Sequence, residues 1–229
     1  MKDNRDQPTN TLNSPRVASL LERLFQESDA SNAKLRAMLG DISPEERARR
    51  MADPHADYRK FFARVRELYM AVSPETARLL YMLARANGAR AIVEFGTSFG
   101  ISTIHLAAAL RDNGGGRLIG SELESLKVER ARANLVAAGL DDLVDVREGD
   151  ALETLSRDLP ETIDLLLLDG HKPLYLPIFD LVAPRLRTGA LLVADNIDAS
   201  PEYLARVRAT GGGYLSVPFA EDVELSIKV

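Results

Sequence analysis

Short apolar runs alternate with helical stretches from residue 91 onward, and this alternation limits the chain to few folds. The runs that predict strands are residues 91–95, 117–122, 144–148, 163–169 and 190–195. The stretches between them that predict helices are residues 101–112, 125–139, 151–159 and 174–187. Strands and helices that alternate in this way build a parallel sheet covered on both faces. We therefore predict an α/β fold with a doubly wound, Rossmann-like, mostly parallel sheet.

The end of the chain departs from this alternation. Residues 213–219 and 223–229 are two apolar runs with only Ala220, Glu221 and Asp222 between them. So short a connection cannot hold a crossover helix, and it predicts an antiparallel hairpin. The hairpin would complete a seven-stranded sheet at one edge.

The rest of the chain predicts an N-terminal extension. Residues 1–15 are polar and predict a disordered tail, residues 16–72 predict a helical extension, and residues 73–229 form the α/β domain. Apolar side chains recur at helical spacing in the extension, at Val17, Leu20, Leu21, Leu24 and Phe25 and again at Tyr58, Phe61, Phe62, Val65, Leu68 and Tyr69. We expect this extension to serve as a lid or a dimer surface.

Three Ser-Pro-Glu triplets, beginning at Ser43, Ser73 and Ser200, predict helix starts. Each offers a serine N-cap, a proline at the first helical position and an acid in the first turn. The helix that starts after Ser73 is expected to stop at Gly88.

The composition excludes several classes of protein. The 34 acidic and 29 basic residues give a net charge of -5, which argues against nucleic acid as the main partner. The chain has no cysteine, so disulfides, thiolate metal sites and a cysteine nucleophile are excluded, and a reducing compartment is favoured. We find no signal peptide and no apolar run of membrane-spanning length, so we expect a cytoplasmic protein without a membrane partner.

Acidic or small polar residues follow every predicted parallel strand. Ligands of α/β sheets bind beyond the carboxyl ends of the strands, so these residues are candidates for a site. They are Glu94, Gly96, Glu122, Gly149, Asp150, Asp169, Asp195 and Asn196. One such residue is explained by a helix cap, whereas several at one edge of the sheet predict a binding site.

The stretch VEFGTSFGIST, residues 93–103, predicts a tight loop between a strand and a helix. Gly96 and Gly100 would let a ligand approach the backbone, and the first amides of the helix would point into the loop. The spacing is G-x-x-x-G rather than G-x-G-x-x-G, which argues against a nicotinamide dinucleotide. Glu94, just ahead of the glycines, favours a cationic or amine-bearing ligand.

Two further acids lie where a nucleoside could bind. Glu122 ends the second predicted strand and could accept hydrogen bonds from ribose hydroxyls, with Glu124 as the alternative. Asp150 follows the third strand, where it could border an adenine edge or simply cap the next helix.

From about residue 70 to its end, the chain resembles the class I S-adenosylmethionine-dependent methyltransferases. The likeness is carried, in this order, by MAVSPET, VEFGTSFGIST, IGSELE, REGDALE, LLLLDGHKPLY and LLVADN. It is greatest to the metal-dependent O-methyltransferases of the catechol and caffeoyl-CoA type. Residues 1 to about 55 carry no matching motif.

The resemblance implies cofactor contacts at specific positions. It places Glu94, Gly96, Ser98, Ser102 and Asp169 near the methionine end of S-adenosylmethionine, with Met70 to Val72 closing over it. It further implies that Glu122 holds the ribose, and that Asp150 and Ala151 border the adenine.

The resemblance also implies a metal site and a catalytic base. Asp169, Asp195 and Asn196 would hold a divalent ion, and hard oxygen ligands suit Mg²⁺. Lys172 would take the proton of the acceptor hydroxyl. His171 is an alternative base, a substrate contact or a solvated loop residue.

The expected acceptor is a small hydroxylated molecule, such as a vicinal diol or a catechol, and the family implies a homodimer. Catechol-type members carry a further acid in the segment before the last hairpin; that segment is short here, with Glu221 as the candidate, and this departure weakens a specific prediction of catechol. The alternatives are a metal-independent methyltransferase, a nicotinamide dehydrogenase and a non-catalytic cofactor-binding module. A nucleic-acid methyltransferase is disfavoured because no N-P-P-Y-like motif occurs.

Overall fold

The computed structural model describes residues 10–39, 43, 58–219 and 222–229. Its helices are α1 (Pro15–Leu39), α3 (Tyr58–Arg64), α4 (Pro74–Ala86), α5 (Ile101–Asp112), α6 (Ser125–Ala138), α7 (Ala151–Thr154), α8 (Tyr175–Val182) and α9 (Pro201–Arg208). Its strands are β1 (Ala91–Phe95), β2 (Arg117–Glu122), β3 (Val144–Glu148), β4 (Ile163–Leu168), β5 (Leu186–Ala194), β6 (Tyr214–Phe219) and β7 (Val223–Lys228).

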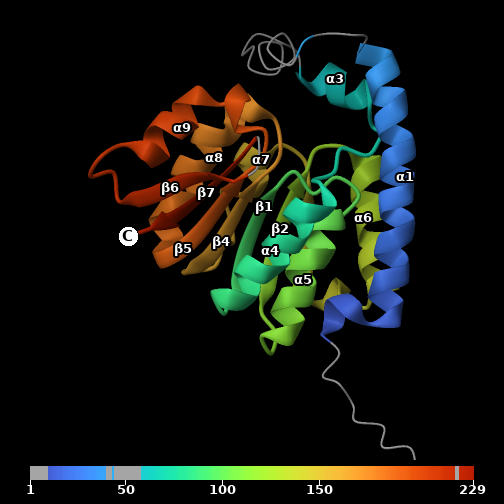
Figure 1. Ribbon diagram of the computed structural model, residues 1–229, viewed down its shortest axis with the longest axis horizontal. Coiled ribbons are helices and arrows are strands. Elements are labelled where there is room, and N and C mark those ends of the chain that lie inside the picture. Colours follow the sequence, from blue (N-terminus) through green and yellow to red (C-terminus); the bar gives the residue numbers. More distant parts are fainter. Residues whose placement is uncertain (1–9, 40–42, 44–57, 220–221) are drawn as a thin grey trace, which may run out of the picture.

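The strands form one seven-stranded sheet in the order β3-β2-β1-β4-β5-β7-β6 (Figure 1). Strands β1 to β5 pair in parallel, whereas β7 is antiparallel to both β5 and β6. Both the doubly wound sheet and the antiparallel hairpin at its edge are therefore confirmed.

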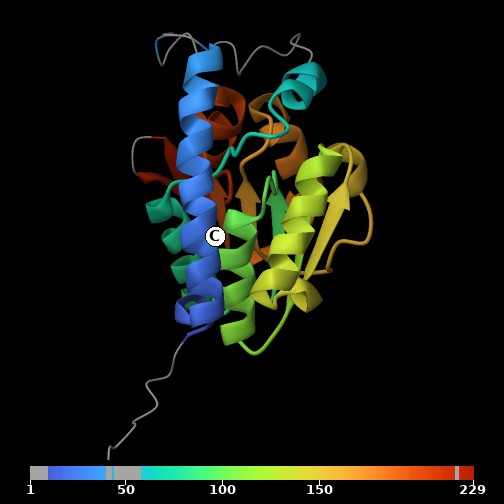
Figure 2. The same ribbon diagram turned by 90° about the vertical axis from the view of Figure 1, so that its right-hand side faces the viewer.

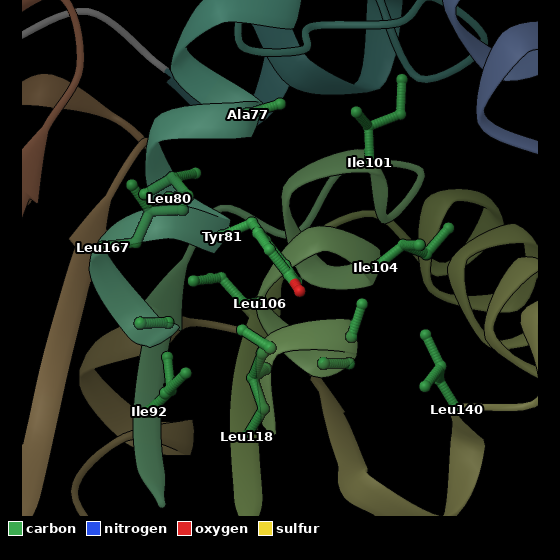
Figure 3. Packing of buried hydrophobic residues seen from close by; sticks show 14 of the residues in the cluster. Ala77, Leu80, Tyr81, Ile92, Ile101, Ile104, Leu106, Leu118, Leu140 and Leu167 are labelled. Carbon is green, nitrogen blue, oxygen red and sulfur yellow. The ribbon is translucent and has the colours of Figure 1, made fainter. Parts of the chain in front are cut away.

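The sheet separates two hydrophobic cores. Helices α1, α4, α5 and α6 contribute to the core on one face, and α7, α8 and α9 to the core on the other (Figures 1 and 2). The leucines of β4 alternate between the two, with Leu165 and Leu167 in the first core and Leu166 and Leu168 in the second. Figure 3 shows Leu167 packed with α4 and α5 side chains such as Leu80 and Leu106. An unbroken leucine run is thus explained by a central strand with both faces buried.

Helix α1 is part of the first core. Val17, Leu20, Leu21 and Leu24 are all buried there, so the apolar face of this helix packs on its own chain. Thr11 lies ahead of the helix, and its backbone N–H and hydroxyl both donate to the Asp112 carboxylate. The predicted disordered tail is therefore wrong for residues 10–15, which the structure shows ordered, and residues 1–9 lie outside the described part.

Two predicted helices are shorter than their sequence patterns. Helix α7 stops at Thr154, because the Arg147 guanidinium binds the carbonyl oxygens of Thr154, Arg157 and Asp158. Those carbonyls are then held in a turn instead of continuing a helix. The predicted helix at 174–187 ends early because Leu186 already pairs with Ile163, at the start of β5.

The helix starts follow their capping residues. Ser73 caps α4 by accepting a hydrogen bond from the Thr76 N–H, and the helix ends at Ala86, just before Gly88 with its φ of +60°. Helix α9 begins after Ser200, although no side-chain cap bond forms there. The third predicted start, after Ser43, lies outside the described residues. No helix in the described part of the chain is long and apolar enough to cross a membrane.

Candidate functional site

The loop after β1 brings the carboxyl ends of two strands into close contact. A Cβ on Gly96 would lie 2.5 Å from the carbonyl oxygen of Asp169, and Gly96 has a φ of +98°. Glycine is therefore required here for both space and backbone conformation. Asp169, at the end of β4, therefore packs directly against the loop that contains Gly96.

Glu94 lies beneath the loop and is fully buried. Its carboxylate accepts hydrogen bonds from the hydroxyls of Ser102 (2.6 Å), Thr103 (2.6 Å) and Thr97 (3.2 Å). Burial nevertheless raises the pKa of Glu94 to about 7. The carboxylate thus ties the loop to the first turn of α5.

A pocket opens above this network. It is lined by Tyr69, Met70, Ala71, Gly96, Thr97, Ser98, Phe99, Ile101, Ser102 and Asp169. The structure therefore brings together Met70, Gly96, Ser98, Ser102 and Asp169 of the predicted cofactor residues, while Glu94 lies below the pocket wall and Val72 is buried.

The hydroxyl of Ser98 is a buried group with no hydrogen-bond partner among the described residues. Ser98 also has a φ of +48°, an unusual conformation for a residue other than glycine. A buried polar atom without a partner is costly unless a ligand satisfies it. This pocket wall is therefore suited to a polar ligand.

Glu122 supports the same loop from β2. One of its carboxylate oxygens accepts the Ser98 N–H at 2.7 Å, and the other accepts the Glu124 N–H at 3.0 Å. Each oxygen keeps a lone pair that could accept a further hydrogen bond. Glu124 itself is the N-cap residue of α6 and makes no side-chain cap bond.

Asp150 both caps a helix and holds a distant segment. One oxygen accepts the Leu152 N–H at the start of α7, where the neighbouring Ala151 is buried. The other accepts the Tyr58 hydroxyl at 3.2 Å and the Arg59 guanidinium at 2.7 Å. Burial opposes ionisation, but these donors lower the pKa of Asp150 below its usual value. Helix α3 is thereby fastened to the end of β3.

At the end of β4 and β5, two acids lie side by side. The Asp169 N–H donates to the Phe95 carbonyl and the Asp195 N–H to the Leu168 carbonyl, so sheet pairing continues one residue beyond the strands. The two carboxyl groups are partly buried and close enough for each charge to act on the other. Burial raises the pKa of both, and the Asp169 charge adds to the effect that brings Asp195 to about 8.

Lys172 is the cation nearest to this pair. Its ammonium is buried, lies 3.3 Å from the Asp169 carboxylate and donates to the Tyr175 hydroxyl at 2.8 Å. Tyr175 in turn donates to the Asp195 carbonyl at 2.8 Å. The lysine is therefore held by a carboxylate and a phenol that both belong to the predicted LLLLDGHKPLY motif.

Asn196 follows Asp195 with a left-handed φ of +49°. Its amide nitrogen donates to the Asp222 carboxylate at 2.9 Å, which leaves its amide oxygen as an acceptor. Asp222 is the described acid nearest to the position predicted for Glu221, which lies outside the described residues. The Ile197 N–H also bonds the Asp222 carbonyl, so the hairpin connection is anchored to this loop.

The donor set here fits a hard divalent cation. Two buried carboxylates share one ammonium, and an added cation would relieve their repulsion. No group of three or more His, Asp or Glu side chains able to hold a metal occurs in the described residues, so the predicted set relies on the Asn196 amide. Asp169, Asp195 and Asn196 could supply three oxygens, and the remaining positions of the ion would be open.

His171 forms the aromatic border of this end of the site. Its ring stacks on Tyr58, with centroids 4.5 Å apart and planes 19° from parallel, and it meets Phe62 edge-on. Burial and the nearby Lys172 charge lower the pKa of His171 to about 4, so the ring is neutral near pH 7. The third option for His171, a freely solvated loop residue, is therefore wrong.

Sequence reasoning missed several residues of the site. Tyr58 and Arg59 were expected only as parts of an amphipathic helix, because their contacts with Asp150 and His171 are far away in the sequence. Tyr175 lies within the quoted LLLLDGHKPLY motif, three residues after Lys172, and that spacing was a usable signal. The hydroxyl set around Glu94 could be found from Thr97, Ser102 and Thr103 in the loop motif.

Comparison with known proteins shows which family part of this chain matches. Residues 93–197 match the family described as "Methyltransferase domain". A catechol O-methyltransferase from Niastella koreensis is 37% identical over 131 residues, which are 56% of this chain and 58% of that relative. The chain thus spans less than two thirds of that relative's length.

Two solved structures share the fold. An O-methyltransferase from Bacillus cereus in complex with SAH superposes with a TM-score of 0.63 at 24% identity, over 77% of this chain and 93% of that one. The O-methyltransferase TomG from Streptomyces achromogenes, involved in tomaymycin synthesis and in complex with SAM, gives 0.57 at 25% identity over 90% and 98%. Residues 93–197 therefore match the methyltransferase family, and the chain has the fold of these O-methyltransferases.

Proposed function

We propose that this protein transfers the methyl group of S-adenosylmethionine to a hydroxyl of a small molecule, with the help of a divalent cation. One arrangement supports this more than any other feature. A pocket with an unpartnered Ser98 hydroxyl meets, at Asp169, a cluster of two partly buried carboxylates and one buried ammonium. A ligand in the pocket would therefore lie directly beside the acid–lysine cluster.

The pocket is suited to the methionine end of the cofactor. Ser98 and Ser102 offer hydroxyls to its amino acid group, and Met70 also lines the pocket. Glu122 and Asp150 follow the next two strands, where they would accept hydrogen bonds from the ribose and the adenine. When bound, S-adenosylmethionine supplies an activated methyl group on a cationic sulfur, which the neighbouring acids would favour electrostatically.

The acid cluster is suited to the acceptor. Asp169, Asp195 and Asn196 would hold Mg²⁺, which when bound would lower the pKa of an acceptor hydroxyl and orient its oxygen. Lys172, as the neutral amine after loss of its own proton to solvent, would take the hydroxyl proton as the oxygen forms its bond to the methyl carbon, and the sulfur would keep the electron pair of the broken sulfur–carbon bond. Tyr175 and Asp169 would hold the lysine nitrogen in place during this transfer.

The acceptor side favours a flat diol. His171, stacked on Tyr58 and bordered by Phe62, offers an aromatic wall beside Lys172. A vicinal diol or catechol could place one oxygen at the cation and the other towards Asp222, which already anchors Asn196. We therefore propose a catechol-like acceptor over an isolated alcohol.

Methyl transfer can be tested with the purified chain, radiolabelled S-adenosylmethionine and a panel of catechols, single phenols and aliphatic alcohols. We expect transfer to catechols with Mg²⁺ and at least a tenfold loss with EDTA. A Val136→Ala variant, which changes an exposed residue of α6, serves as the unchanged control. Failure to methylate any hydroxylated acceptor would contradict the proposed function.

A metal-independent methyltransferase is the second candidate. It is favoured by the contact between Lys172 and Asp169, which already pairs one of the two acids without a metal. In that case EDTA would leave the rate unchanged and Asp195→Asn would reduce it little. The same assay therefore separates the two candidates.

A further inference from the structure

Two segments of the chain supply most of the pocket lining, and the first of them is fixed through its backbone. It consists of residues 96–102, the loop after β1 and the start of α5. The Gly96 N–H donates to the Ser121 carbonyl of β2 at 3.0 Å. The Asn134 amide of α6 donates to the Phe99 carbonyl, also at 3.0 Å. This part of the lining is therefore tied both to the sheet and to a helix.

The second segment, residues 69–72 between α3 and α4, is held differently, and we call it the linking segment. Its residues Tyr69, Met70 and Ala71 line the pocket. It has no regular secondary structure, and among the described residues no backbone–backbone hydrogen bond holds it. The position of the linking segment therefore depends on its side chains.

Tyr69 is the side chain that joins the linking segment to the loop. Its ring is buried and stacks on Phe99, with centroids 4.2 Å apart and planes 29° from parallel. The buried Lys127 ammonium of α6 lies 5.6 Å from the centroid of the Phe99 ring, so Phe99 is also supported from α6. Stacked rings tolerate many offsets, so the stack sets how closely Tyr69 approaches but leaves it free to slide.

Glu27 of α1 supplies the directional contact that the stack lacks. One oxygen of its carboxylate accepts the Tyr69 hydroxyl at 2.5 Å, and the other accepts the Arg23 guanidinium at 2.7 Å. The bond from Tyr69 holds the pKa of Glu27 below its usual value, so the carboxylate is charged at neutral pH. Hydrogen bonds to a charged acceptor are shorter and stronger than those to a neutral one. The bond to Glu27 therefore stops the Tyr69 ring from sliding on Phe99.

Helix α1 is a firm anchor for this bond. Leu20, Leu21 and Leu24 are buried in the first core, and Glu27 follows Leu24 by three residues, beside the apolar face of the helix. The helix packs on α5 and α6 (Figure 2). A change in the position of Glu27 would therefore require a movement of α1 against the core.

We propose that Glu27 is a positioning residue for the cofactor, because it fixes Tyr69 and with it the neighbouring pocket residues Met70 and Ala71. The inference rests on the proposed function, since it takes S-adenosylmethionine as the ligand of the pocket. Glu27 is not among the residues that line the pocket and lies 42 residues before Tyr69. A lining segment that is held in place before the ligand arrives loses less conformational freedom on binding, so the affinity is higher.

Binding of S-adenosylhomocysteine to the full chain, measured by calorimetry, tests this. Glu27→Ala and Tyr69→Phe each remove the same hydrogen bond, so each should weaken binding about tenfold. The double variant should bind no more weakly than either single variant. Glu27→Gln should stay within about threefold of the wild type, because its amide oxygen still accepts the Tyr69 hydroxyl. Glu22→Ala, which removes an exposed acid of α1, is the matched control and should bind like the wild type.

Hydrogen exchange of the ligand-free chain gives a second readout that does not depend on the cofactor. We expect the amides of the linking segment to exchange faster in Glu27→Ala than in the wild type, and those of residues 96–102 to keep their rates. A wild type that does not bind S-adenosylhomocysteine would contradict the proposed function, and the exchange rates would still decide this inference.

Thermal melting shows whether each variant is folded. If Glu27→Ala unfolds, Tyr69→Phe carries the test, because it keeps the buried ring and its stack on Phe99. A folded variant of either kind that binds S-adenosylhomocysteine as tightly as the wild type, or that leaves exchange in the linking segment unchanged, would overturn the proposal. Equal weakening by Glu22→Ala would also overturn it, because the effect would then come from the charge of α1 and not from the contact with Tyr69.

Discussion

The pocket and the acid cluster at the ends of β4 and β5 differ in how many hydrogen-bond donors and cations of the chain pair with their carboxylates. At the pocket, Glu94 accepts three side-chain hydroxyls and Glu122 accepts two backbone N–H groups. At the ends of β4 and β5, Asp169 and Asp195 share the single ammonium of Lys172. The carboxylates of the first end are paired by donors of the chain itself, whereas the two acids of the second have one ammonium between them. We infer that preorganisation holds the cofactor and that the acceptor end depends on an added cation.

The largest effect is expected when the base is removed from the acceptor end. Lys172→Met should lower kcat by about 10² to 10⁴, because the acceptor proton then has no positioned acceptor. Binding of S-adenosylhomocysteine should change little, since the pocket contacts lie on the other side of Asp169. Steady-state rates and calorimetric binding check the two halves of this prediction.

Lys172→Arg is the matched control for charge. It keeps the pairing with Asp169 but cannot act as a base at neutral pH, so its rate should also be low. A Lys172→Met variant with more than a tenth of the wild-type rate would show that the lysine is not the base.

The pocket end of the site, where Glu94 is fully hydrogen-bonded, predicts a protein stability that depends on pH. Because burial raises the pKa of Glu94 from 4.5 to about 7, the folded chain binds the proton more tightly than the unfolded chain. The contribution of Glu94 to stability is therefore present below about pH 4.5 and is lost as pH rises to about 7, by about 3 kcal/mol.

Denaturant unfolding of the wild type and of Glu94→Gln, compared between pH 5 and pH 8, checks this value. Glutamine does not titrate, so the stability of the wild type relative to the variant should fall over this range. A constant difference would mean that the three hydroxyls fully compensate for burial.

Removal of one of the two acids at the ends of β4 and β5 should stabilise the metal-free protein. Asp195→Asn keeps the shape but removes the repulsion with Asp169 that is present once Asp195 is ionised, above its pKa of about 8, so we expect a gain of about 1 kcal/mol at pH 9. Thermal melts in EDTA measure it, with Asp180→Asn on the outer side of α8 as the control. A loss of stability would show that Asp195 is satisfied by the chain alone.

The smallest effect is expected where α3 links the two ends. Tyr58→Phe keeps the ring that stacks on His171 but removes the hydroxyl that bonds Asp150. We expect about a threefold weaker cofactor affinity and an unchanged KM for the acceptor, since one long, partly buried hydrogen bond contributes about 1 kcal/mol or less. Tyr58→Leu, which removes the stack, should raise the acceptor KM as well.

The strands could be predicted from the sequence because their signal is local. The predicted bounds of β1, β2 and β3 match the structure, since each is a short run with apolar side chains that stands between two helical patterns. Helix α7 was predicted too long because Arg147 binds carbonyls that follow it, and no local pattern shows such a contact.

The site was predictable to the same extent. Asp169, Lys172 and Asp195 follow neighbouring strands, so the sheet order alone brings them together. The role of α3 was not predictable, because Arg59 and Asp150 are 91 residues apart and meet only in the folded chain. The helical extension was predicted to serve as a lid or a dimer surface, and amphipathic spacing alone could not show that the apolar face of α1 packs in the first core.

The central claim is that the acceptor end is completed by a divalent cation. A Mn²⁺ titration followed by electron paramagnetic resonance tests it, on protein saturated with S-adenosylhomocysteine and with Asp195→Ala measured alongside. We expect the free-ion signal to be lost up to one equivalent in the wild type and to remain in the variant. A free-ion signal that persists in the wild type, or an equal loss in both proteins, would contradict the claim.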